Sequence, residues 1–398
     1  MQNGTLAPPF QPLQQISFFS NPGAPTSANF ANPYNGVSTG PSGFPPSLTF
    51  IGWQLPHSYK SPLVQEYNVS VQQQLTNDMG FEIGYVGSRG NYLPIFIEVN
   101  PTTYAATNSI TPLTNAYKSA GYSQSPFPAF GLTRPTFSAG RSWYDSMQAN
   151  LQLRNFHHLF TTVAYTWSHS FDNASGLNIG GDSRPVLPAI VGNQPSIDAA
   201  VARERGPSLY DARNRLVLSL QYALPTFTVH RAIERAIVNG WNFNTIFQVQ
   251  SGSPLSIMNA NTTAQSLTFR PDQTCDANSS GAHIAGTGKF QHYFKTACFA
   301  LPTMVLNGVT LVDNSHSGNA PRNSVLGPGF NTTDASLFKA IPVSDRGKFE
   351  FRFEVFNVFN EARFNNPVGT FGASTFGQIT STAGNDSRVI QLAGKISF

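Results

Sequence analysis

Lys348 to Asn360 reads KFEFRFEVFNVFN, and its residues alternate in character with a period of two. Odd positions from Phe349 to Val355 are apolar, whereas even positions from Lys348 to Glu354 are charged. A period of two is typical of a β-strand. One face of this strand needs apolar surroundings and the other needs water, because unpaired charges are costly in a dry interior. A soluble sheet packed on a core satisfies this pattern, and so does a membrane barrel with lipid outside and water inside.

The composition favours the barrel. Of the 398 residues, 11% are charged, against a typical share of about 25%, while 40% are hydrophobic and 12% are aromatic. A soluble surface normally carries more charge, whereas a lipid-facing band and a neutral polar lumen do not need it. The net charge of +4 comes from 24 scattered Lys and Arg residues, and such diffuse basicity indicates no nucleic-acid partner.

The same alternation recurs along the chain and predicts about nine strands. They fall at residues 63–75, 81–85, 147–153, 161–167, 216–224, 241–249, 335–340, 348–360 and 388–398. Short links alternate strictly with long loops, expected at Arg89 to Ser142, Ser168 to Asn214 and Ser251 to Asp334. Transmembrane barrels have this arrangement, with short periplasmic turns and long external loops, whereas a soluble sandwich mixes both lengths at both ends.

The predicted fold is therefore all-β, an antiparallel transmembrane β-barrel with long external loops. Residues 62–398 would supply about nine to ten strands of a larger barrel, and residues 1–61 would form an irregular external segment. An odd count that starts outside suggests a chain cut in an external loop, although a missed strand near Ser47 to Trp53 would undo this inference. No apolar run of about 18 residues predicts a transmembrane helix. Met1 is not followed by a signal peptide, which suggests a cytoplasmic protein or a chain beginning inside a longer one.

Several smaller patterns complete the prediction. The link Pro225 to Gly240 contains RAIERAIV, which suits one or two helical turns, and Val305 to Val312 has a hairpin signal at Asn307–Gly308. Aromatic residues at strand ends, Tyr67, Tyr85, Trp167, Tyr222, Trp241 and Phe359, would lie at the two membrane interfaces.

Two candidate functional features concern the cysteines and the chain end. Cys275 and Cys298 share one long loop without C-x-x-C spacing or paired histidines, so a zinc site is not expected. A disulfide in an oxidising compartment and two free thiols both remain open. The final strand places Ile396 and Phe398 on one apolar face, a poor edge for a soluble protein. It resembles the C-terminal signal of bacterial outer-membrane barrels, which the barrel-assembly machinery recognises.

No pattern of residues predicts catalysis, a cofactor or a metal site. Glu350 and Glu354 alternate with Arg352, which favours an ion-pair ladder in the lumen over a glycosidase acid pair. The chain is therefore not expected to be an enzyme.

Several blocks of sequence together resemble a known family. They are SPLVQEYNVSVQQQL, FEIGYVGSRGNYLP, YDSMQANLQLRN, FTTVAYTWSHSFDN, DARNRLVLSLQYALP, GWNFNTIFQVQSGSPLSI, PRNSVLGPGFNTTDASLFKAIPV and FEFRFEVFNVFNEARFNNP. In this order they are similar to the C-terminal barrel of Oar-like TonB-dependent outer-membrane receptors. The resemblance implies a barrel of about 22 strands around a plug domain, a segment that contacts TonB and a carboxypeptidase-regulatory-like domain. None of the last three is visible in this sequence.

The resemblance implies active import of an unidentified ligand across the outer membrane. Outer-membrane lipid and the barrel-assembly machinery would be partners, and TonB would act only through a plug domain absent from this chain. External loops would capture the ligand, and the face rich in Asn and Gln would line its path. Two alternatives stay open: a secreted carbohydrate-binding or adhesin-like β-sandwich, and a non-functional receptor fragment.

Overall fold

The computed structural model describes most of the second half of the chain and parts of the first. Described residues are 50–51, 59–97, 132–133, 135–176, 189–191, 194–259, 270–278, 284–286, 289–306, 309–312, 318–342, 347–384 and 387–398. The segment predicted at 1–61 therefore lies almost wholly outside the described residues.

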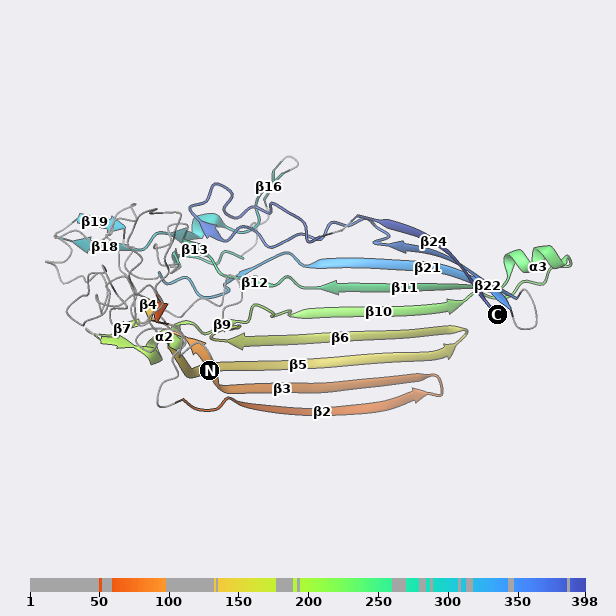
Figure 1. Cartoon of the computed structure of the whole chain (residues 1–398), viewed down its shortest axis with the longest axis horizontal. Coiled ribbons are helices and arrows are strands. Elements are labelled where there is room, and N and C mark those ends of the chain that lie inside the picture. Colours follow the sequence, from red (N-terminus) through yellow and green to blue (C-terminus); the bar gives the residue numbers. More distant parts are fainter. Residues whose placement is uncertain are drawn as a thin grey trace, which may run out of the picture.

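Nine long strands form one antiparallel sheet in which neighbours in sequence are neighbours in space (Figure 1). They are β2 (Leu63–Thr76), β3 (Met79–Phe96), β5 (Thr136–Phe156), β6 (Leu159–Asp172), β10 (Asn214–Ala223), β11 (Trp241–Gln250), β21 (Phe330–Pro342), β22 (Lys348–Phe356) and β24 (Val389–Ser397). All nine predicted strands are present. The two-residue strand β9 (Gly206–Pro207) adds to β6 beyond its pairing with β10.

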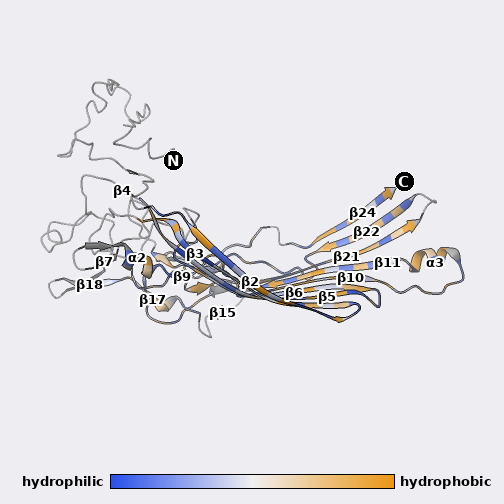
Figure 2. Cartoon of the chain, turned by 90° about the horizontal axis from the view of Figure 1, so that it is seen from below, coloured by the Kyte–Doolittle hydropathy of each residue, from blue (hydrophilic) through white to orange (hydrophobic). Residues whose placement is uncertain are grey.

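The sheet is curved and open, as Figure 2 shows, and its two edge strands are β2 and β24. Its apolar face has no second layer over it among the described residues. Val69 and Leu392, near opposite edges, are 71% and 67% exposed. A β-sandwich would bury such side chains between two sheets, so the sandwich alternative is wrong.

The ends of the sheet differ. At one end the strands are joined by short links, and the C-terminus lies at the same end (Figure 1). The β5–β6 link is a two-residue turn in which His157 and His158 have φ of 50° and 67°, the conformation of a type I′ hairpin. The β10–β11 link contains α3 (Ala232–Val238), where one or two helical turns were predicted. No helix among the described residues is long and apolar enough to cross a membrane.

The opposite end carries long loops with short elements of their own. Paired strands are β1 (Phe50–Ile51) with β4 (Leu132–Thr133), β7 (Ala189–Val191) with β8 (Gln194–Ser196), β12 (Pro254–Leu255) with β20 (Val325–Leu326), β13 (Met258–Asn259) with β23 (Thr370–Phe371), β14 (Asp272–Gln273) with β17 (Phe299–Ala300), β15 (Ile284–Gly286) with β16 (Lys289–His292) and β18 (Thr303–Leu306) with β19 (Val309–Val312). Two short helices, α2 (Ile197–Arg203) and η2 (Thr296–Cys298), complete them. The predicted hairpin is β18–β19, although its turn lies outside the described residues.

Several predicted loop boundaries are wrong. Arg89 and Ser142 were expected to bound a loop, but β3 runs on to Phe96 and β5 begins at Thr136. Likewise β6 continues past Ser168. The backbone ladder of these strands continues where both faces are polar or mixed, so period-two alternation no longer marks it. The weak strand suspected near Ser47 to Trp53 is β1, which pairs with β4 and not with the main sheet.

Candidate functional site

The register of the sheet separates its side chains into two faces. Residues directly opposite each other in an antiparallel ladder share a face. One continuous row across six strands is therefore Leu159, Tyr222, Phe243, Leu337, Phe353 and Leu392. Similar rows lie on either side of it, so this face is apolar from β2 to β24.

The other face is polar and mostly uncharged. Its side chains include Asn68, Ser70, Gln72, Gln148, Asn150, Gln152, Ser219, Gln221, Asn242, Asn244, Gln248, Thr332 and Ser336. A hollow of about 310 Å³ on this face is lined by residues of β2, β3, β5 and β6. Amide and hydroxyl groups both donate and accept hydrogen bonds, so this face offers a ligand a solvated path with few charges, of which Glu82 lines the hollow.

Charge on the polar face gathers toward the last strands. Glu350 pairs with Arg352 on β22, and Lys395 of β24 lies opposite Glu350 in the register. Of the ion-pair ladder predicted from the sequence, the structure shows the Glu350–Arg352 pair, on the part of the wall furthest from β2.

The long loops pack into a small core beyond the strand ends. Phe294 lies at its centre, with ring centroids 5.8 Å from Phe299 and 5.3 Å from Phe376 in edge-to-face contact. Other buried members are Leu255, Ile257, Ala277, Cys298, Ala320 and Val325. Phe376 belongs to the β22–β24 connection and the rest to the β11–β21 connection, so two loops fold together into one body. We call this body the loop assembly.

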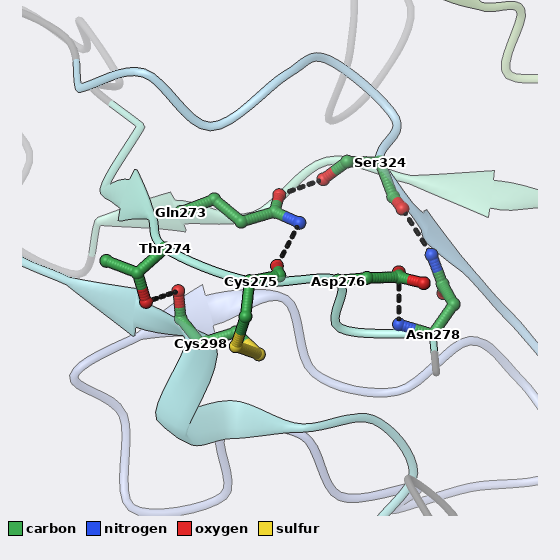
Figure 3. Close-up of a disulfide and its surroundings, with 7 residues drawn as sticks. All are labelled: Gln273, Thr274, Cys275, Asp276, Asn278, Cys298 and Ser324. Atoms are coloured by element: carbon green, nitrogen blue, oxygen red, sulfur yellow. Dashed lines mark hydrogen bonds between the residues drawn. A yellow bond between two sulfur atoms is a disulfide. The ribbon is translucent and has the colours of Figure 1, made fainter. Parts of the chain in front are cut away.

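Cys275 and Cys298 form a disulfide inside the loop assembly (Figure 3). The Thr274 backbone N–H donates to the Cys298 carbonyl oxygen at 2.8 Å, which continues the β14–β17 pairing. The Gln273 side chain donates to the Cys275 carbonyl oxygen at 2.9 Å and accepts from Ser324 at 2.9 Å. The bridge therefore closes a loop whose two ends are already held together by hydrogen bonds.

Removing this bridge is expected to destabilise the loop assembly. It joins residues separated by 23 positions, and a loop of that length restricts the unfolded chain by roughly 3 kcal/mol at 25 °C. Replacing both Cys275 and Cys298 with serine should lower the urea midpoint of loop unfolding, followed by the fluorescence of a probe in the loop. Wild-type protein treated with a reductant should show the same shift. An unchanged midpoint in both samples contradicts this prediction.

Arg322 ties the loop assembly to the sheet. This buried guanidinium pairs with the Asp172 carboxylate at the end of β6 and donates to the Asp172 carbonyl oxygen at 2.6 Å. It also donates to the Glu204 carbonyl oxygen at 2.8 Å. One side chain of the β11–β21 loop thus binds both β6 and the β6–β10 loop.

A second buried ion pair lies beside it. Arg270 binds Glu204 in a bidentate geometry, with N–O distances of 2.6 and 2.9 Å. Burial raises the pKa of the Glu204 carboxyl, but the charge and hydrogen bonds of Arg270, with the charges of Arg203 and Arg322, outweigh it and lower the pKa overall. The carboxyl is therefore ionised in the folded protein.

This shift predicts acid sensitivity of the loop assembly. A lowered folded-state pKa means that Glu204 stabilises the fold above its ordinary pKa of 4.5, and that this contribution is lost as pH falls through the lowered value. Wild-type protein should exceed Glu204→Gln in urea midpoint at neutral pH, and the difference should shrink progressively below pH 4.5. A difference that is constant down to pH 3 contradicts the assignment.

The predicted interface aromatics fall into two groups on the apolar face. Tyr67, Tyr85 and Trp167 lie toward the long-loop end, and Tyr222 and Trp241 lie at the short-link end. Phe359 lies past the end of β22 and belongs to neither row.

The chain end is exposed at the short-link end of the sheet. Ile396 lies opposite Phe349 on the apolar face of β24, and Phe398 is 99% exposed. Among the described residues, no group of three or more His, Cys, Asp or Glu side chains could hold a metal ion.

An open sheet with one apolar face, one amide-rich face and paired strands of 10 residues is the wall of a transmembrane barrel, whose strands need about 9–11 residues. Residues 1–391 match the family model described as "Outer membrane beta barrel domain". The chain belongs to this family, and its place is the outer membrane. The apolar face therefore contacts lipid and the polar face lines the lumen. In this family of barrels short turns are periplasmic and long loops are external.

Solved structures with similar arrangements are outer-membrane transporters. The transporter YddB from Escherichia coli aligns with a TM-score of 0.43 and 11% identity, over 86% of this chain and 33% of that one. The receptor FpvA from Pseudomonas aeruginosa, bound to pyoverdine, aligns with a TM-score of 0.39 and 9% identity, over 87% and 31%. The chain thus spans about a third of their length. No curated protein matches it in sequence.

The buried ion pairs were not predicted from the sequence. Asp172 and Arg322 are 150 positions apart, and neither lies in an alternating segment. A charged residue within a chain of low charge is the only signal that could have pointed to them.

Proposed function

We propose that this chain forms part of the wall of an Oar-like TonB-dependent transporter, with residues 62–398 as its C-terminal barrel portion, that imports a ligand across the outer membrane. The observation that carries the proposal is the amide-rich lumen wall beneath a folded loop assembly. The order of the sequence blocks that resemble Oar-like receptors supports the same assignment.

Import divides between three parts of the chain. The loop assembly makes the first contact with the ligand outside the cell. Its buried Arg322–Asp172 pair keeps it fixed to the wall, and its Arg270–Glu204 pair joins it to the β6–β10 loop. The amide-rich lumen face then offers exchanging hydrogen bonds along the path. Strands β22 and β24, at the edge of the sheet furthest from β2, carry a group of charges that includes Glu350 and Arg352. This charged part of the wall suits contact with a folded plug domain.

Partners follow from this assignment. The barrel-assembly machinery would bind the edge strand β24 near its end, where Ile396 and Phe398 are exposed. TonB would act through a plug domain supplied outside these strands. The proposal includes no catalysis and no cofactor.

A photo-crosslinking amino acid tests the transporter assignment. It is placed at Gln248, on the lumen face, and in a matched variant at Phe247, on the lipid face. The proposal predicts that the Gln248 variant, irradiated in the outer membrane, is linked to a polypeptide that mass spectrometry identifies as a TonB-dependent plug domain. The Phe247 variant should be linked to lipid.

Two results would overturn the proposal. If neither variant is linked to a plug polypeptide, the barrel is a passive pore or a receptor fragment without function. If both variants are linked to the same polypeptide, the two faces are not separated as lumen and lipid sides.

A further inference from the structure

Helix α3 exposes apolar side chains in the periplasmic link between β10 and β11. Ile233 and Ile237 are 75% and 62% exposed, and their spacing of four places them on one side of the helix. Glu234 and Arg235 point elsewhere around the axis. Figure 1 places α3 beyond the strand ends, away from the loops. An apolar helical stripe without cover among the described residues needs an explanation.

The link before α3 carries a further exposed aromatic side chain. Phe227 is exposed, and its backbone is held by Asn239, which accepts from the Phe227 N–H at 2.6 Å and donates to its carbonyl oxygen at 2.9 Å. Gly240, with φ of 82°, then turns the chain into β11. Phe227 is therefore fixed beside the end of the helix.

The C-terminal end of α3 is attached to the lipid-facing side of the barrel. Trp241 donates from Nε1 to the Ile237 carbonyl oxygen at 2.8 Å, and Lys339 donates from Nζ to the same oxygen at 2.8 Å. Trp241, Lys339 and Phe351 lie opposite one another in a single row of the register. This row belongs to the apolar face, so α3 is continuous with the surface that contacts lipid.

Lys339 would otherwise be misplaced on this face. A cation on the lipid-facing side of a barrel is costly, yet Lys339 is only 5% exposed. Its ammonium group lies 5.0 Å from the centre of the Trp241 ring and binds the carbonyl oxygens of Ala236 and Ile237. Free carbonyls at a helix C-terminus attract cations. These contacts compensate the charge of Lys339, and they hold the C-terminal end of α3 against the lipid-facing side of the sheet.

We propose that α3 lies in the headgroup region of the periplasmic leaflet of the outer membrane, with Phe227, Ile233 and Ile237 inserted among phospholipid chains. Continuity with the lipid-facing row through Trp241 and Lys339 favours lipid over a periplasmic protein as its occupant. Arg231, which is largely exposed and pairs with Glu234 at 3.5 Å on the helix surface, can also meet phosphate groups. Short amphipathic helices with apolar and basic sides bind membrane surfaces in this way.

Depth-dependent quenching tests this inference. Ile233→Cys and, as the matched control from the other side of the helix, Arg235→Cys are labelled with the fluorophore NBD in the full chain with its native disulfide. The proteins are reconstituted in phosphatidylethanolamine–phosphatidylglycerol vesicles containing lipids with a nitroxide quencher near the headgroup. Labels at Leu218 and Ser219, on the lipid and lumen faces, calibrate the scale.

The expected result is that NBD at position 233 is quenched at least about twofold more strongly than NBD at 235 and emits at shorter wavelength. Lys339→Gln should reduce this difference, because it removes the cation that holds the helix end. Equal quenching at 233 and 235 overturns the proposal. Blue-shifted emission at 233 without quenching also overturns it, since the stripe would then be covered by protein.

Discussion

Replacing Arg322 with alanine is expected to destabilise the loop assembly by about 3–5 kcal/mol, the cost of leaving a buried charge without its partner. The Asp172 carboxylate is buried and would lose the guanidinium, and the backbone carbonyl oxygens of Asp172, Glu204 and Gly206 would lose this donor. The loss should appear as at least 100-fold faster hydrogen exchange for amides in the β11–β21 and β6–β10 loops. Amides in β10 and β11 should exchange at unchanged rates.

The control is Arg388→Ala, which removes an exposed arginine from the β22–β24 connection. An exposed charge is worth little, so exchange in the loop assembly should stay as in the wild type. Asp172→Asn combined with Arg322→Met should recover part of the stability, because it removes both buried charges. If Arg322→Ala leaves loop exchange unchanged, Arg322 does not join the loops to the sheet.

An arginine in place of Leu218 is expected to cost up to about 4 kcal/mol in the membrane, because a charge on the lipid face near the bilayer midplane is expensive. Leu218 lies in the middle of β10, between Val163 and Phe247 in one apolar row. The variant should show a lower urea midpoint in lipid vesicles and a smaller membrane-inserted fraction.

Ser219 provides the matched control one position along the same strand. It lies on the lumen face, opposite Thr162 and Ile246, where arginine stays hydrated. Ser219→Arg should therefore insert and unfold like the wild type. Equal losses in both variants would mean that neither face contacts lipid selectively.

The sequence predicted the sheet because each strand carries its own evidence. Alternation such as that of Phe349 to Val355 is a local pattern. Two alternating strands joined by a link as short as Asn155 to His158 can pair only as an antiparallel hairpin. Nine strands and their order could therefore be read without a structure. The ends of β3 and β5 that lie toward the long loops could not be predicted, because beyond the lipid band their side chains no longer alternate.

The loop assembly was not predictable for a different reason. Its core joins Phe294 of one loop to Phe376 of another, and Arg322 reaches Asp172 across 150 positions. Such contacts depend on where the strands of the sheet place the ends of the loops, and no local sequence pattern encodes that arrangement. The role of α3 was hidden similarly: RAIERAIV predicts helical turns, but only the register shows that Trp241 and Lys339 lie on the lipid side.

The position of Thr245 and Ile246 tests the barrel most directly, because register and hydropathy disagree there. Thr245 lies opposite Ala335 on the lipid face, and Ile246 lies opposite Asp334 on the lumen face. Spin labels at these two positions, in the chain reconstituted in vesicles, should show collision with oxygen dominant at 245 and with a water-soluble nickel complex dominant at 246. The reverse order, or equal access at both positions, would contradict the barrel wall described above.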